Sequence, residues 1–129
     1  MNIVVIGSLA FDDVITKQGS VHHILGGSAL YFSMTASLFV PVNVIGVVGG
    51  DFPREELVYL RSRGVNVDGV EIIKSGKTFR WAGEYETDMN IRRTTNLELN
   101  VFAAFNPVLD SVPEKHLLFF SGILTPTFN

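Results

Sequence analysis

The sequence has 129 residues, enough for one domain with a packed core and too few for two. It is 47% hydrophobic and 18% charged with a net charge of −3, which argues against a disordered chain and against a general nucleic-acid binder. It has no cysteine, no apolar run of the roughly 18 residues that a membrane span needs and no basic signal-peptide start, so we expect a cytoplasmic protein with neither a membrane nor nucleic acid as its partner.

The N-terminal part of the chain alternates between strand and helix patterns. Residues 3–6 are a continuous β-branched run, which predicts a strand buried on both faces, and the mixed segment 20–25 predicts an edge strand. Ser28 is expected to N-cap a helix that continues to about Phe39. A second buried strand is expected over 42–49.

A second helix is expected after this strand. Asp51 is its predicted N-cap, Pro53 is expected in its first turn, and Gly64 is expected to end it. A third strand is predicted over 70–73. The resulting βαβαβ order predicts an α/β fold with a parallel sheet and covering helices.

The pattern changes between residues 77 and 100, where apolar and polar residues alternate. Alternation predicts an antiparallel hairpin with one covered and one wet face, with Trp81 on one side, Arg80 on the other and a turn over 87–90. A hairpin inserted into an α/β chain is commonly a lid. A further buried strand is expected over 116–124.

Asp12 is the first candidate for binding chemistry. It lies just past the first predicted strand, at the sheet edge where open α/β sheets hold ligands. Its carboxylate could accept hydrogen bonds from the two adjacent hydroxyls of a sugar, whereas a solvated loop acid or a helix cap is the commoner outcome for such a residue. A dinucleotide site is disfavoured, because only Gly7 of the G-x-G-x-x-G fingerprint is present.

The glycine pair Gly26-Gly27 also has two interpretations. Without Cβ atoms, these glycines could let a ligand hydroxyl reach N–H groups at the start of the helix that follows. The alternative, commoner for an isolated motif, is a tight turn into the helix. The glycines of "GVVGGD" lack the Lys-Ser/Thr of a phosphate loop and are interpreted as structural. No metal site is expected, because the neighbours His22 and His23 should point to opposite faces of a strand.

Taken together, three motifs in this order resemble the PfkB, or ribokinase-like, carbohydrate kinases: "IGSLAFD", "GGSALYFSMTA" and "NVIGVVGGDFP". The hairpin is similar to the family's lid, and its sequence resembles a group of PfkB-type proteins assigned only as sugar kinases. The resemblance implies a ribokinase-like α/β fold, a mostly parallel sheet with covering helices and a lid at about 13–25 and 77–100. It covers only the N-terminal part of the family's domain, so residues 1–129 are expected to end before its C-terminal half.

In this family, the aspartate after the first strand and the paired glycines hold the hydroxyls of the acceptor. The residues that the resemblance implies for substrate binding are Asp12, Gly26, Gly27, Ser28, Arg80 and Trp81. Many members have an asparagine where this chain has Leu30-Tyr31, which argues against assigning ribose, fructose or adenosine in particular.

The family's catalytic base, anion hole and nucleotide loops lie in its C-terminal half. The resemblance therefore implies ATP and Mg²⁺ as cofactors that bind outside this segment, and no catalytic residue within it. For the full-length protein it implies an ATP-dependent kinase that phosphorylates a hydroxyl of a sugar or nucleoside, whereas the segment alone is expected to be inactive. The alternative is a non-catalytic α/β module that binds a polyol or forms a homodimer through the lid.

Overall fold

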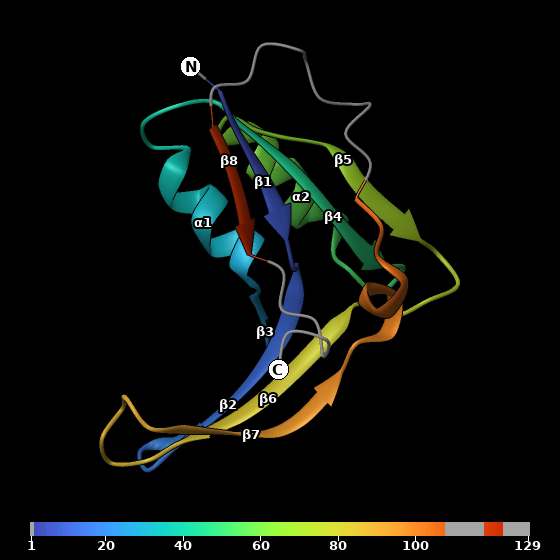
Figure 1. The fold of residues 1–129 in the computed structure, drawn as a ribbon. Helices are drawn as coiled ribbons and strands as arrows, with labels where there is room; N and C mark the ends of the chain where they lie inside the picture. Colours follow the sequence, from blue (N-terminus) through green and yellow to red (C-terminus); the bar gives the residue numbers. More distant parts are fainter. Residues whose placement is uncertain (1, 108–117, 123–129) are drawn as a thin grey trace.

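The computed structural model of this protein describes residues 2–107 and 118–122. Its strands form two four-stranded sheets, one above the other in Figure 1. Two α-helices, α1 (Ser28–Ala36) and α2 (Arg54–Ser62), pack against the upper sheet. No helix within the described ranges is long and apolar enough to cross a membrane.

The first sheet is parallel throughout and has the strand order β5-β4-β1-β8. Its central strands, β1 (Ile3–Gly7) and β4 (Val42–Gly49), are almost entirely buried, as their unbroken apolar runs predict. They are flanked by β5 (Val65–Ile73) and β8 (Leu118–Gly122). The strand predicted over 116–124 is therefore confirmed for β8, and the other residues of that range lie outside the described part.

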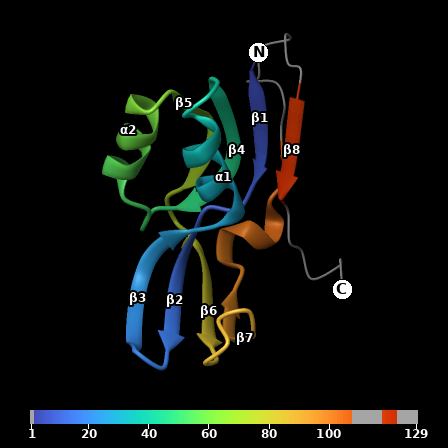
Figure 2. The same cartoon turned by 90° about the vertical axis from the view of Figure 1, so that its left-hand side faces the viewer.

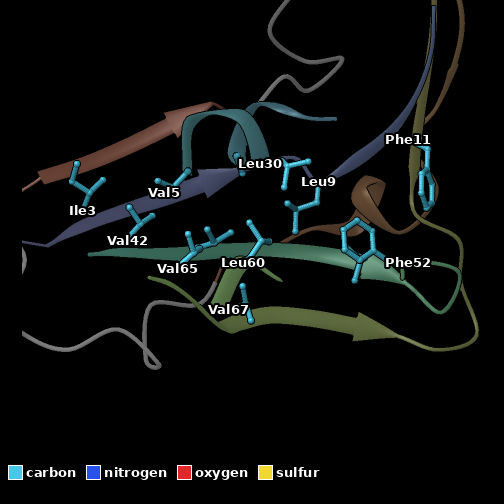
Figure 3. Close-up of a cluster of buried hydrophobic side chains, with 13 residues drawn as sticks. Ile3, Val5, Leu9, Phe11, Leu30, Val42, Phe52, Leu60, Val65 and Val67 are labelled. Atoms are coloured by element: carbon cyan, nitrogen blue, oxygen red, sulfur yellow. The ribbon is translucent and has the colours of Figure 1, made fainter. Parts of the chain in front are cut away.

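Both helices cover the same face of this sheet (Figure 2). The core lies between them and the strands and contains aliphatic side chains from every layer, including Ile3, Val5, Leu30, Val42, Leu60 and Val65 (Figure 3). It continues to Leu9, Phe11 and Phe52, where the first sheet meets the second. The aromatic rings of Phe11 and Phe52 are 6.0 Å apart between centroids, so the core connects the two sheets.

The helix ends differ from the prediction. Ser28 is the first residue of α1 and Gly27 is its N-cap, with φ of 102°, and the helix ends at Ala36 because residues 37–39 form a turn. The predicted caps of α2 are also partly wrong. Pro53 is the N-cap, and the Asp51 carboxylate instead accepts hydrogen bonds from the backbone N–H and hydroxyl of a distant residue, Thr78.

The second sheet has the order β3-β2-β6-β7 and extends below the first in Figure 1. The central strands β2 (Ala10–Thr16) and β6 (Phe79–Tyr85) are parallel, and the edge strands β3 (Gly19–Gly26) and β7 (Arg92–Glu98) pair with them antiparallel. The predicted hairpin and the edge strand are thus confirmed. The expected covered face is wrong, because β7 is exposed along its whole length. A short 3₁₀ helix, η1 (Asn100–Ala104), follows β7.

Candidate functional site

Asp12 does not lie in a loop, as its position after the first strand suggested, but near the N-terminal end of β2 in the second sheet. Its Cα pairs with Ile24 on β3 and with Trp81 on β6. The side chain is half-buried, and within residues 2–107 no group donates a hydrogen bond to its carboxylate. Burial, and secondarily the charge of neighbouring Asp13, raises the pKa of Asp12. This carboxylate therefore has unused acceptor capacity at an accessible place.

Gly26 makes room for that carboxylate. It pairs with Ala10 across the β2–β3 ladder, two residues from Asp12 along β2. A Cβ atom on Gly26 would overlap the Asp12 carboxylate and lie 2.6 Å from its Cγ. Glycine is required here because the acid side chain lies across the backbone of β3.

Gly27 allows the backbone of Ser8 to approach the start of α1 closely. A Cβ atom at this residue would overlap the carbonyl of Ser8, and its φ of 102° is one that other residues rarely adopt. Ser8 then occupies the start of α1: its hydroxyl accepts the Ser28 N–H at 3.0 Å and its carbonyl accepts the Ala29 N–H at 3.0 Å. These two N–H groups have partners within the chain, so they do not form the open hydroxyl-binding site that the sequence suggested.

Asp13 lies on the opposite face of β2 and has several partners. Its Oδ1 accepts the backbone N–H of His23 at 2.6 Å, and its Oδ2 accepts a hydrogen bond from Arg80 at 3.4 Å. The His23 N–H, and then the charges of Arg80 and His22, lower the pKa of Asp13. The structure therefore places Arg80 with Asp13 and not with Asp12.

Trp81 lies on the same face of the sheet as Asp12, because the two residues are paired across β2 and β6. Its ring lies over Gly83, where a Cβ atom would overlap it. The indole N–H donates to the Thr94 hydroxyl at 3.1 Å, and the Arg92 guanidinium lies 5.6 Å from the ring centroid. Trp81 is thus a fixed apolar wall on the same face of the sheet as Asp12, with its ring held towards β7.

The prediction for the two histidines is wrong. His23 has a φ of 58° and its ring stacks on Phe11 with centroids 3.9 Å apart, while His22 Nδ1 lies 3.9 Å from Asp13 Oδ1. Phe11 and Asp13 share one face of β2, so both histidines lie on that face. A positive φ at His23 breaks the alternation on which the prediction rested.

Among the described residues, no three histidine, aspartate or glutamate side chains lie close enough together to hold a metal ion. The glycines of "GVVGGD" face the chain's own backbone: the Gly49 N–H donates to Thr78 Oγ1 at 2.9 Å and the Gly50 N–H donates to the Gly76 carbonyl at 3.0 Å. Both N–H groups therefore bond within the chain, as the structural interpretation of these glycines predicts.

Sequence reasoning missed Asp13, His23 and the Thr94 partner of Trp81 as parts of the site. The signal for Thr94 was available, because a hairpin whose turn spans 87–90 brings residue 94 opposite Gly83, over which the indole lies. No local pattern indicates the bond between Asp13 and the His23 N–H, since it depends on the register between β2 and β3.

Solved structures share this fold. A ribokinase from Cryptococcus neoformans var. grubii, solved with ADP, has a TM-score of 0.73 and 18% identity over 91% of this chain. A protein of Thermoplasma acidophilum provisionally named a ribokinase has a TM-score of 0.66 and 26% identity over 93% of this chain. The chain has a ribokinase-like fold. A nucleoside kinase from Burkholderia thailandensis, solved with inosine, has a TM-score of 0.61 and 16% identity over 76% of it.

The ribokinase-like chain spans 39%, 44% and 36% of the lengths of these three proteins, so it corresponds to part of each of them. These coverages are consistent with a chain that corresponds to the N-terminal segment of the fold. The predicted α/β class with a mostly parallel sheet is confirmed, as is the resemblance to ribokinase-like sugar and nucleoside kinases. No protein-family model and no curated protein matches the sequence.

Proposed function

We propose that this chain forms the acceptor-binding part of an ATP-dependent kinase that phosphorylates a hydroxyl of a sugar or nucleoside. The observation that carries the proposal is the Asp12 carboxylate. It is half-buried, it has no hydrogen-bond donor among the described residues, and Gly26 gives it space at the junction of the two sheets. Structures with this fold include sugar and nucleoside kinases, which supports the proposal.

The chemistry of Asp12 suits a polyol acceptor. Two adjacent hydroxyls can donate to the two oxygens of one carboxylate, and such charge-assisted hydrogen bonds are about twice as strong as neutral ones. Phosphoryl transfer depends mainly on positioning and electrostatic stabilisation, so a residue that fixes the acceptor hydroxyl contributes to rate without reacting itself.

The other proposed substrate-binding residues divide by position. Gly26 and Gly27 shape the backbone next to Asp12, and Ser28 begins α1 at the same junction. Trp81 would form the apolar wall on which a sugar or base ring lies. The placement of Arg80 on the other face gives no support for direct contact with the acceptor.

Asp12→Asn tests the proposal. The variant keeps the shape of the side chain and removes the charge, so we expect acceptor affinity to fall by about one to two orders of magnitude. NMR titration of the chain with D-ribose and inosine measures this, with thermal unfolding to confirm that the variant folds. Asp13→Asn is the control and should have the smaller effect, because Asp13 lies on the other face. Unchanged affinity in Asp12→Asn would contradict the proposal.

The chain without further segments is expected to bind the acceptor and not to phosphorylate it. A coupled assay of ADP release over the same ligands checks this. Release of ADP above background that depends on the acceptor would show that the catalytic groups lie within these 129 residues.

A homodimer through the second sheet is a second candidate role, favoured by the exposure of its edges. Val21 on β3 and Leu97 on β7 are about half exposed, at 51% and 49%, and among the described residues each edge strand pairs along one side only. Exposed strand edges readily pair with another chain. Sedimentation velocity over a range of concentrations distinguishes a dimer from a monomer, and Leu97→Lys should weaken a dimer that uses this edge.

A further inference from the structure

The β2–β3 ladder contains a bulge directly beside Asp12. Asp12 pairs with Ile24, but the next pair is Val14 with Val21, so Asp13 alone stands opposite both His22 and His23. The extra residue on β3 is accommodated by His23, whose φ of 58° is unusual for a residue other than glycine. Backbone conformations of this kind persist only when the surrounding structure holds them in place.

The bulge determines which residue of β3 lies beside Asp12. If the register of the turn, with Val14 opposite Val21, continued without a bulge, then His23 would lie opposite Asp12 and Leu25 opposite Ala10. A slip of one residue moves every side chain to the other face of the sheet. Gly26 would no longer face Ala10, and the space that it leaves for the Asp12 carboxylate would be lost.

Asp13 is the side chain that holds the bulge. Its Oδ1 accepts the His23 N–H at 2.6 Å, within the bulge where the regular ladder is interrupted. Its Oδ2 reaches Arg80 on the neighbouring strand β6, so one carboxylate connects three strands. The stacking of His23 on Phe11 supports the same geometry, because Phe11 is buried.

We propose that Asp13 is a positioning residue for the acceptor site: by fixing the bulge through the His23 N–H, it holds the Asp12 carboxylate over Gly26. It acts through the backbone and touches no acceptor. The proposal rests on the proposed function for its effect on binding, whereas its effect on the geometry of Asp12 can be measured without a ligand.

Two substitutions separate the hydrogen bond from the charge. Asp13→Asn removes the charge but keeps a carbonyl oxygen for the His23 N–H, whereas Asp13→Ala removes both. Glu84→Ala is the matched control: Glu84, on β6 opposite Ile15, is likewise a carboxylate bonded to an arginine, Arg93 at 2.9 Å, but it takes no part in the bulge. All three are titrated with D-ribose and inosine beside Asp12→Asn.

We expect Asp13→Ala to weaken binding by about tenfold to hundredfold, as a displacement of about 1 Å in a site can. Asp13→Asn should weaken it far less, and Glu84→Ala should bind normally. Two measurements need no ligand. Hydrogen exchange at the His23 amide should be about tenfold faster in Asp13→Ala than in Asp13→Asn. The pKa of Asp12, measured by NMR, should also be lower in Asp13→Ala than in Asp13→Asn, because the displaced carboxylate is better solvated.

If Asp12→Asn loses affinity while Asp13→Ala binds as tightly as Asp13→Asn, the positioning role is wrong and the proposed function stands. If Asp12→Asn binds normally or the wild-type chain binds neither ligand, the proposed function fails, and the positioning role is judged on the two ligand-free measurements. In that case, an equal exchange rate of the His23 amide and an equal Asp12 pKa in Asp13→Ala and Asp13→Asn would overturn the positioning role. If Asp13→Ala does not fold, Asp13→Ser takes its place with the same expectations, because its shorter side chain moves the oxygen away from the His23 N–H.

Discussion

Replacing Gly26 by alanine tests whether the space beside β3 exists for the Asp12 carboxylate. Gly26 is not one of the glycines with a positive φ, so its backbone tolerates a side chain, and the obstacle is the acid. The new Cβ would lie 2.6 Å from Cγ of Asp12, whereas ordinary contacts are 3.4–4 Å. The carboxyl group must therefore move by roughly 1 Å, enough to cost up to about a hundredfold in a positioned site.

The cost in stability should be much smaller than the cost in binding. The overlapping atoms are the end of a side chain that can rotate, and replacing glycine by alanine where the backbone allows it stabilises a protein by about 0.4–1 kcal/mol through the unfolded state. We expect Gly26→Ala to change the free energy of unfolding by less than about 1 kcal/mol while acceptor affinity falls by about one to two orders of magnitude.

The assay combines NMR titration with D-ribose and inosine and thermal unfolding followed by circular dichroism. A double-mutant cycle with Asp12→Ala isolates the cause, because the overlap disappears when the acid is absent. Gly26→Ala should then stabilise the Asp12→Ala protein more than it stabilises the wild type. Wild-type affinity in Gly26→Ala, or equal effects on stability in both backgrounds, would refute the role of this glycine.

Four further predictions concern stability and pH. Gly27→Ala should destabilise the fold by at least about 2 kcal/mol, visible as a lower midpoint in urea, because its positive φ and the Ser8 carbonyl both oppose a side chain. Thr78→Val should cost about 2 kcal/mol or more by the same measurement, because the hydroxyl bonds both Asp51 and a buried backbone N–H. Acceptor affinity should fall as the pH drops through the raised pKa of Asp12, at a higher pH than for an ordinary aspartate. Ionised Asp13 affects stability instead, because its pKa is lower in the folded protein than in the unfolded chain. Its full contribution to the free energy of unfolding is present above the pKa of an unfolded aspartate and is lost as the pH falls through the lower folded value. Unfolding followed by NMR as a function of pH measures this loss.

The regular parts of the fold could be predicted because their causes are local. The unbroken apolar runs of β1 and β4 reflect burial on both faces, and Gly64 ends α2 with a φ of 84°, as a glycine after a helix predicts. The alternation of β6 identified the hairpin and placed Trp81 and Arg80 on opposite faces, which the pairings confirm.

The parts that could not be predicted depend on contacts distant in sequence. β2 lacks a clean alternation of apolar and polar residues, and a bulge lies at the centre of its pairing with β3. Asp51 resembled a cap, but its partner is Thr78, from which it is separated in sequence by α2 and β5. Ser28 resembled a cap because it precedes an apolar run, whereas the oxygens that accept the first N–H groups come from Ser8. The position of Asp12 after the first strand made it a candidate, but only the family resemblance favoured substrate binding over the commoner solvated acid.

The parallel pairing of β2 with β6 has a consequence for the order of folding. Ala10 pairs with Phe79, so this ladder closes a loop that contains α1, β4, α2 and β5. Contacts this far apart in sequence form slowly unless intervening structure has already shortened the path between them. Strands β1, β4 and β5 with their two helices are therefore expected to form early, and the two halves of the candidate site meet afterwards. During synthesis, Asp12 and Gly26 leave the ribosome long before Trp81, which predicts that the nascent chain gains acceptor affinity only after β6 has emerged and paired with β2.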